Sequence, residues 1–245
     1  MTAPPCVLYL DAGNTRLKWG VADASGWQCQ EALPWEQLAE LPPRLRALSS
    51  LPTQAVLASV VDDAREATLR STLALPEVRK IRVVRQAAGI TTDYDPARLG
   101  VDRWCALIGA RAQTRQAALV VTAGTATTID RLNADGHFSG GLILPGLDLM
   151  RTALNQGAAR LPLLEGAYTP CPTNTADAIL SGCLEAQIGA IERAFRRLPA
   201  NAHCLLSGGA AEHLAPHLNL PMCLVPNLTL EGMRVWQQHT QGQGV

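Results

Sequence analysis

The sequence has no net charge and no long apolar run. Its 21 lysine and arginine residues balance 21 aspartate and glutamate residues over 245 positions. A neutral chain has no overall field that would draw it to nucleic acid or to an anionic membrane. Glycine, proline, threonine or a charge interrupts every apolar stretch before the roughly 18 to 20 residues that a bilayer-spanning helix needs. We therefore expect neither nucleic acid nor a membrane as a partner.

The sequence also lacks the marks of an exported or metal-binding protein. No lysine or arginine precedes Arg16, and the first apolar stretch stops at Asp11, which argues against a signal peptide. Seven cysteines include no C-x-x-C pair, and five histidines include no H-E-x-x-H motif. We therefore expect a cytoplasmic protein with reduced thiols.

Apolar residues make up 47% of the chain, which is ample for a core, and their pattern alternates between strands and helices. This alternation is typical of an α/β fold whose sheets are covered on both faces. The pattern predicts a proline-broken helix within 34–51, helices at 62–74, 101–114, 174–198 and 230–240, and strands at 7–10, 17–21, 55–61, 81–85, 117–132 (strand, turn, strand), 136–146 and 204–207.

One strand-turn-strand unit occurs twice. The segments LYLDAGNT and LVVTAGTA align with Ala12 over Ala123 and Gly13 over Gly124. Each copy opens one half of the chain, and strands and helices follow it in both halves. We therefore expect two domains, residues 1–115 and 116–245.

The first copy ends its strand on a carboxylate and turns toward a lysine. Gly13 allows the backbone to approach a phosphate closely, and Asn14 and Thr15 supply hydrogen bonds. Asp11 is suited to hold Mg²⁺ directly or through water, and Lys18 supplies a point charge. Asp, Gly and Asn are also the residues of an ordinary hairpin turn, so both interpretations stay open here.

Two further glycine turns favour the phosphate-binding interpretation. The segment GTATT carries the hydroxyls of Thr125, Thr127 and Thr128, which suit phosphate oxygens. Gly208 and Gly209 follow a predicted strand and leave room for an adenine ring against the backbone. Neither a Walker P-loop nor a G-x-G-x-x-G motif occurs, so the usual nucleotide-binding folds are not indicated.

The segment GVDRW carries a candidate catalytic pair. Asp102 stands at the start of a predicted helix, where it can cap free backbone N–H groups. An aspartate near a γ-phosphate can equally accept the proton of an attacking hydroxyl, and Arg103 can bind a carboxylate at two points. The two roles of Asp102 do not exclude each other.

Six segments in order resemble the type III pantothenate kinases of the actin, sugar-kinase and Hsp70 superfamily: DAGNTRLKWG, LGVDRW, TAGTATTID, GGLILPG, NTADAILSG and LLSGGAAEHL. The resemblance implies an α/β fold of two tandem RNase H-like (actin-like ATPase) domains, with mixed central sheets flanked by helices. It implies phosphorylation of pantothenate by ATP with Mg²⁺, the first step of coenzyme A synthesis, in a homodimer.

The resemblance also implies roles for individual residues. Asp102 matches the proton acceptor, and Arg103 is the natural partner of the pantothenate carboxylate. The phosphate and ATP contacts match Asp11, Gly13, Asn14, Thr15, Lys18 and Thr125. The substrate contacts match Tyr94, Gly100, Val101, Asp102, Arg103 and Thr175.

One position departs from the family pattern. Many members have an aspartate that ligates a monovalent cation, K⁺ or NH₄⁺, at the dimer interface, where this sequence has Thr122. A neutral hydroxyl does not replace a carboxylate beside potassium, so we expect weaker dependence on the cation. The predicted helix 174–198 offers apolar positions either for the dimer contact or for the core of its own domain.

Two other functions remain open from the residues alone. One is a nucleotide-binding regulator without catalysis, against which the presence of Asp11, Asp102 and Arg103 argues. The other is a kinase with a different acceptor, such as a sugar or acetate. Arg103 favours an acidic substrate, and only the family resemblance selects pantothenate.

Overall fold

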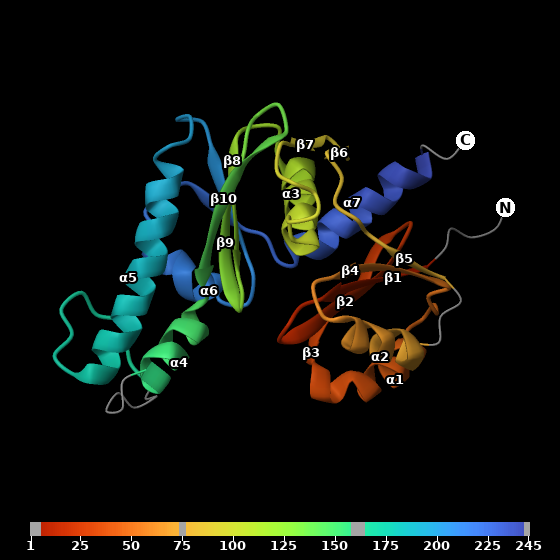
Figure 1. The fold of residues 1–245 in the computed structure, drawn as a ribbon, viewed down its shortest axis with the longest axis horizontal. Helices are drawn as coiled ribbons and strands as arrows, with labels where there is room; N and C mark the ends of the chain where they lie inside the picture. Colours follow the sequence, from red (N-terminus) through yellow and green to blue (C-terminus); the bar gives the residue numbers. More distant parts are fainter. Residues whose placement is uncertain (1–5, 74–76, 158–164, 243–245) are drawn as a thin grey trace. The chain divides into compact units, whose positions relative to one another are not determined.

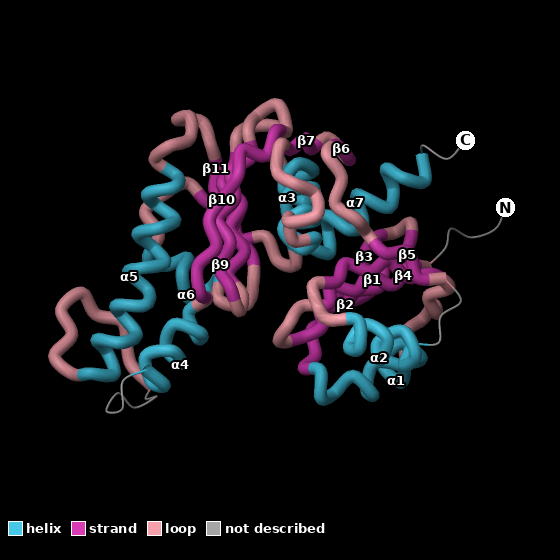
Figure 2. Tube along the Cα trace, in the orientation of Figure 1, coloured by secondary structure: helices cyan, strands magenta, loops and turns pink. Residues whose placement is uncertain are grey.

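The computed structural model describes residues 6–73, 77–157 and 165–242, which form two compact units (Figures 1 and 2). The first unit contains Met1–Gln113 and Asn227–Val245, and the second contains Thr114–Pro226. We expected everything after residue 115 to belong to the second domain. The C-terminal segment instead groups with the first unit.

The first unit is built on a mixed five-stranded sheet in the order β3-β2-β1-β4-β5. Strands β1, β2 and β3 are antiparallel neighbours, whereas β4 runs parallel to both β1 and β5. Every residue of β1 is buried, so this strand is the centre of the unit. The strands are β1 (Val7–Ala12), β2 (Arg16–Asp23), β3 (Gly26–Pro34), β4 (Gln54–Ser59) and β5 (Val78–Lys80).

Short helices cover one face of this sheet. Leu41, Leu45 and Leu69 on these helices join strand residues such as Leu8 and Leu10 in one apolar core. The helical elements and the small hairpin of this unit are η1 (Trp35–Glu40), α1 (Leu41–Arg46), α2 (Asp63–Leu73), β6 (Gln86–Ala87), β7 (Ile90–Thr92), α3 (Val101–Gln113) and α7 (Leu228–Gly242).

Close packing of α3 on α7 explains why the C-terminal helix belongs to the first unit. A Cβ atom on Gly232 would lie 1.7 Å from the carbonyl oxygen of Cys105, and one on Gly109 would lie 2.4 Å from that of Leu228. The two helix backbones therefore approach each other at a distance that only glycine permits. This contact joins residues far apart in sequence, and the apolar pattern of 230–240 alone does not reveal it.

The second unit contains its own strands in the order β12-β11-β8-β9-β10. Strands β8, β9 and β10 are antiparallel neighbours, and β11 runs parallel to both β8 and β12. These strands are β8 (Ala118–Ala123), β9 (Ala126–Leu132), β10 (His137–Pro145), β11 (His203–Ser207) and β12 (Met222–Leu224).

The long helix of the second unit packs on this sheet. Leu184, Ile188 and Ile191 are buried in a core with Leu119 and Leu206, so this face of the predicted helix 174–198 serves its own unit. Figure 2 shows α5 alongside the strands of the unit. The helices are α4 (Leu147–Gly157), α5 (Thr175–Phe195), α6 (Ala211–Leu214) and η2 (Ala215–His217).

Most predicted elements are present, with one strand displaced. The expected strand 81–85 is wrong, because sheet pairing falls on β5, and only the N–H of Ile81 continues it by donating to Leu57 O (2.8 Å). The apolar pattern missed β3, β12, the β6–β7 hairpin and α4. No helix in the described ranges is long and apolar enough to cross a membrane.

Candidate active site

Asp11 is a buried carboxylate at the end of the central strand of the first unit. Only 7% of its surface is exposed, and Lys18 lies opposite it in the register of β1 and β2. The pKa of Asp11 is raised to about 6, mainly by burial; the charge of Lys18 lowers it, and that of Asp102 raises it by a smaller amount. The predicted phosphate residue and the predicted base therefore lie in one electrostatic cluster.

Asp102 lies in the first turn of α3, one residue after the helix begins. Its carboxylate accepts a hydrogen bond from the backbone N–H of Arg103 (2.8 Å), one of the N–H groups that a helix start leaves free. A Cβ atom on Gly100 would lie 2.5 Å from Oδ1 of Asp102, so glycine leaves room for the carboxylate.

The thiol of Cys105 belongs to the same cluster, although the sequence did not single it out. Cys105 is fully buried one turn after Asp102, and burial raises the pKa of its thiol, with further increases from the charges of Asp11 and Asp102. A neutral, buried thiol therefore forms part of the low-dielectric surroundings of both carboxylates.

The turn after Asp11 is held by two side chains that sequence reasoning missed. Trp35 donates its indole N–H to the carbonyl oxygen of Gly13 (2.8 Å), and Arg65 donates to that of Asn14 (2.9 Å). The guanidinium carbon of Arg65 lies 5.2 Å from the centroid of the Trp35 ring. These contacts leave Asn14 and Thr15 exposed on a fixed backbone. No local pattern marks Trp35 or Arg65, because both act across long stretches of chain.

Arg103 and Tyr94 lie together in the first unit. The guanidinium carbon of Arg103 is 5.7 Å from the centroid of the Tyr94 ring, within the range of a cation–π contact. Arg103 exposes only 5% of its surface, whereas Tyr94 exposes 37%. Val101, which like Arg103 lies in the first turn of α3, is also buried. The N–H of Tyr94 donates to Oγ1 of Thr92 (2.9 Å), which orders the chain there.

In the second unit, the other two glycine turns meet at one edge of the sheet. Strands β8 and β11 are parallel, so their carboxyl ends lie together. Gly208 has φ +101, and a Cβ atom there would lie 2.2 Å from the carbonyl oxygen of Ala123. The N–H of Ala210 donates to the same oxygen (3.1 Å). Gly209 lies between Gly208 and Ala210, so both of its chain neighbours contact Ala123.

The LPG segment after β10 joins the same edge. The N–H of Gly146 donates to the carbonyl oxygen of Thr125 (2.8 Å), and a Cβ atom on Gly146 would lie 2.0 Å from that of Gly124. Three segments from the sequence motifs therefore depend on glycine for their contact.

Only one of the three threonines of GTATT is exposed. Thr125 lies exposed at the turn, whereas Thr127 and Thr128 are buried in β9, with 1% and 8% of their surfaces exposed. The expectation that all three hydroxyls suit phosphate is wrong for the two buried ones.

On β8, the buried hydroxyl of Thr122 has no hydrogen-bond partner among the described residues.

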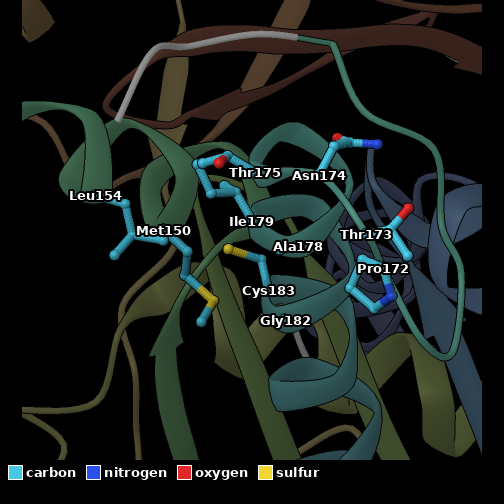
Figure 3. A pocket seen from close by; sticks show the side chains of 10 residues that line it. All are labelled: Met150, Leu154, Pro172, Thr173, Asn174, Thr175, Ala178, Ile179, Gly182 and Cys183. Carbon is cyan, nitrogen blue, oxygen red and sulfur yellow. The ribbon is translucent and has the colours of Figure 1, made fainter. Parts of the chain in front are cut away.

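Thr175 lines a cavity of about 580 Å³ in the second unit. It is the first residue of α5, where the side chain of Asn174 caps the helix by accepting a hydrogen bond from the N–H of Asp177 (3.0 Å). Figure 3 shows Thr175 near Met150 and Leu154 of α4, which supply an apolar wall.

Metal ligands are sparse. Within the described ranges, no three His, Cys, Asp or Glu side chains cluster in a way that would hold a metal ion. Asp11 and Asp102 nevertheless provide a carboxylate pair, and Mg²⁺ commonly binds through one or two carboxylates, substrate phosphates and water. The residues present therefore fit a magnesium ion that arrives with a nucleotide.

The two sheets flanked by helices define the class of the protein, the actin-like ATPase and sugar-kinase fold. A Baf family protein from Campylobacter jejuni has TM-score 0.65 at 19% identity, covering 96% of this chain and 99% of that one. MreB5 of Spiroplasma citri bound to ADP has TM-score 0.52 at 10% identity, covering 98% of both chains. At these identities the likeness concerns the fold alone.

The sequence comparison is more specific. Residues 7–197 match the family model of the type III pantothenate kinases. A type III pantothenate kinase from Dechloromonas aromatica is 48% identical over 233 residues, which are 93% of this chain and 97% of that one. The chain belongs to the type III pantothenate kinase family, which confirms the resemblance read from the motifs.

The raised pKa of Asp11 predicts a pH-dependent stability. An unfolded aspartate titrates near pH 3.9, so between about pH 4 and 6 the native protein retains a proton that the unfolded chain has lost. Stability therefore falls as pH rises through this window, by about 3 kcal/mol in all. We expect Asp11→Asn to unfold at higher urea concentration than the unsubstituted protein at pH 8, and at nearly the same concentration at pH 4.

The control is Asp148→Asn, because the side chain of Asp148 is 97% exposed and its ion pair with Arg151, at 3.9 Å, is a surface contact of small energy. This variant should follow the unsubstituted protein at both pH values. A gain for Asp11→Asn of equal size at pH 4 and pH 8 would contradict an origin in the buried charge.

Proposed function

We propose that the chain transfers the γ-phosphoryl group of ATP to the primary hydroxyl of pantothenate, giving 4′-phosphopantothenate in the first step of coenzyme A synthesis. The observation that carries this proposal is family membership over most of the chain, at 48% identity to a named type III pantothenate kinase. The electrostatic cluster of Asp11 and Asp102 supports it, since both motifs contribute to one place.

In this proposal Asp102 accepts the proton of the attacking hydroxyl as its oxygen bonds to phosphorus and the bond to the leaving ADP oxygen breaks. Much of the rate in phosphoryl transfer comes from positioning and charge stabilisation rather than from the base. Lys18, opposite Asp11, supplies positive charge for phosphate oxygens. The turn of Gly13, Asn14 and Thr15 supplies hydrogen bonds, and its backbone is fixed by Trp35 and Arg65.

Nucleotide contacts are proposed in both units. In the second unit, Thr125 is exposed at its turn and suits a phosphate. Gly208 and Gly209 are the proposed adenine contacts: Gly208 packs on Ala123 and so shapes the turn, and the space at the Cβ position of Gly209 is open to a ring. In the first unit, Asp11 would hold Mg²⁺, directly or through water. Mg²⁺ supplies charge neutralisation for the phosphates when it is bound, and it would also keep the buried Asp11 ionised.

Arg103 is the proposed partner of the pantothenate carboxylate. A guanidinium binds a carboxylate in two-point fashion, and the buried position of Arg103 strengthens that interaction. Tyr94, Gly100, Val101 and Thr175 are the other proposed substrate contacts, with Thr175 on the wall of the cavity beside α4.

We also infer a cytoplasmic homodimer. The second unit exposes large apolar side chains on β10 and α4, including Leu142, Ile143 and Leu149. Successive strand residues face opposite sides of a sheet, so Leu142 and Ile143 leave apolar surface on both faces of β10, and a second subunit packed there would cover part of it. A homodimer agrees with the family resemblance, in which a second subunit completes the substrate site.

A coupled ADP-release assay tests the function. We expect ADP release with pantothenate and none above background with sugars or short hydroxy acids. An analogue with an alcohol in place of the carboxylate should lose about tenfold or more in kcat/KM, because the charge-assisted hydrogen bonds of Arg103 are lost. In Arg103→Ala, pantothenate and the analogue should be used about equally. Equal use of a sugar and pantothenate by the unsubstituted protein would refute the acceptor.

The second test concerns the base. Asp102→Asn should lower kcat by about 100-fold or more, since a positioned base contributes on that scale, and should leave the dissociation constant of ATP nearly unchanged. Asp63→Asn, at an exposed aspartate in the first turn of α2, is the matched control and should keep full turnover. Unchanged turnover in Asp102→Asn would remove the base assignment, and a matching loss of ATP affinity would assign Asp102 to the nucleotide instead.

Thr122 predicts a weak response to monovalent cations. Its neutral hydroxyl brings no negative charge, so we expect similar turnover in potassium and in sodium salts. Thr122→Asp should raise the ratio of the rate in potassium to the rate in sodium. Thr122→Asn, whose side chain has nearly the shape of aspartate but no charge, should not. A large stimulation of the unsubstituted protein by potassium would show that the threonine does not weaken the cation site.

A further inference from the structure

A second cavity, of about 590 Å³, lies in the first unit beside the C-terminal half of α7. This volume is in the range of pockets that hold small molecules. None of the residues assigned to phosphoryl transfer lines it. Its polar and aromatic lining comes from Lys80, Arg82, Gln86, Trp236, His239 and Thr240.

Positive charge is concentrated at this cavity. The segment VRKIRVVR carries Arg79, Lys80, Arg82 and Arg85, and no acidic residue occurs between Glu77 and Asp93. The lining includes no carboxylate. In a chain whose total charge is zero, this is a local excess that favours an anion.

The two basic residues of the lining differ in their surroundings. Lys80 forms an ion pair with Glu66 (2.6 Å), which also pairs with Arg70, so two cations share one carboxylate and the group keeps one net positive charge. Arg82 is exposed, and no described residue forms an ion pair with it. Arg82 therefore provides the main charge for a ligand, with a planar fork of donors suited to phosphate, and Lys80 adds to it.

An indole ring forms another part of the lining. The guanidinium carbon of Arg79 lies 5.5 Å from the centroid of the Trp236 ring, and Arg79 also donates to Oγ1 of Thr240 (3.4 Å). These contacts hold the partly buried ring in place. A fixed indole beside a guanidinium offers a stacking surface to a planar group.

The hairpin tip that closes the lining has an unusual backbone. Ala88 has φ 49 and Gly89 has φ 79, so two successive residues are left-handed. Tight hairpins require this conformation, and Asn or Gly normally supplies its first residue at lower cost than alanine. Backbone strain of this kind is concentrated at ligand sites. Ala88 adds a methyl group to the lining where glycine would be less strained.

We propose that this pocket binds a small organic phosphate of mononucleotide size, with the phosphate at Arg82 and Lys80 and the planar ring against Trp236. The cavity favours a small molecule over a nucleic acid strand, because its lysine and arginine, Lys80 and Arg82, lie two residues apart at one partly open hollow rather than along an extended basic stripe. The site is separate from the phosphoryl-transfer residues, so the proposal does not depend on the proposed activity.

Tryptophan fluorescence titrations with AMP, adenosine, pyrophosphate and a short single-stranded oligonucleotide test the proposal. AMP should bind better than adenosine and better than pyrophosphate, because it engages both the charge and the ring. Arg82→Glu should weaken AMP binding by about tenfold or more, the scale of a lost charge-assisted contact with phosphate. Arg46→Glu, the same charge change at an exposed residue of α1, should leave it unchanged.

Trp236→Phe localises the signal, since it retains an aromatic ring but should remove the fluorescence change. Thermal melting of each variant checks that the fold is intact. Equal AMP affinity in Arg82→Glu and Arg46→Glu would overturn the proposal, as would equal binding of adenosine and AMP. Tighter binding of the oligonucleotide than of AMP would also overturn it, because the pocket would then recognise nucleic acid rather than a small organic phosphate.

Discussion

The burial of one carboxylate, that of Asp11, is the constraint on which the site depends. The central strand of the first unit is buried along its whole length and carries this residue one position before its end, opposite Lys18 and within the field of Asp102. A charge in that position costs stability in the absence of a cation. Such a cost persists where a function requires it, because a metal or a phosphate-bound cation compensates it on binding. The low dielectric that penalises the empty site also strengthens every contact made in the loaded one.

Glycine provides the second constraint, through close approaches between segments that are distant in sequence. Gly208 packs on Ala123, Gly146 packs on Gly124, and Gly232 packs on Cys105. The first two contacts bring the turns of the second unit to one edge of its sheet. The third holds α7 on the helix that carries Asp102. Since a Cβ atom would clash at each position, these glycines serve packing as well as turn geometry. The glycine motifs of the sequence therefore include residues that pack against the backbone as well as residues that face a ligand.

Local patterns in the sequence predicted the parts of the structure that local physics determines. Apolar periodicity found α3, α5 and most strands, and the repeated Ala-Gly turn follows β1 in the first unit and β8 in the second. Family resemblance selected pantothenate, a choice that no residue pattern makes. The predictions failed where the determining contact is distant in sequence. The return of α7 to the first unit depends on Gly109 and Gly232, and the rigidity of the first turn depends on Trp35 and Arg65.

Net charge was a poor guide to local recognition. The balance of acidic and basic residues excludes a global attraction to polyanions, yet the chain separates its charges by place. The buried carboxylate of Asp11 and the half-buried one of Asp102 share a cluster near the end of β1, whereas four basic residues lie within seven positions at and after β5. Salt screens the field of an exposed charge beyond about one Debye length, roughly 8 Å at physiological ionic strength, while a ligand inside a pocket lies much closer than that to the charges that line it. A neutral protein can therefore bind a magnesium nucleotide at one place and a free organic phosphate at another, because each site is governed by the few charges within contact distance.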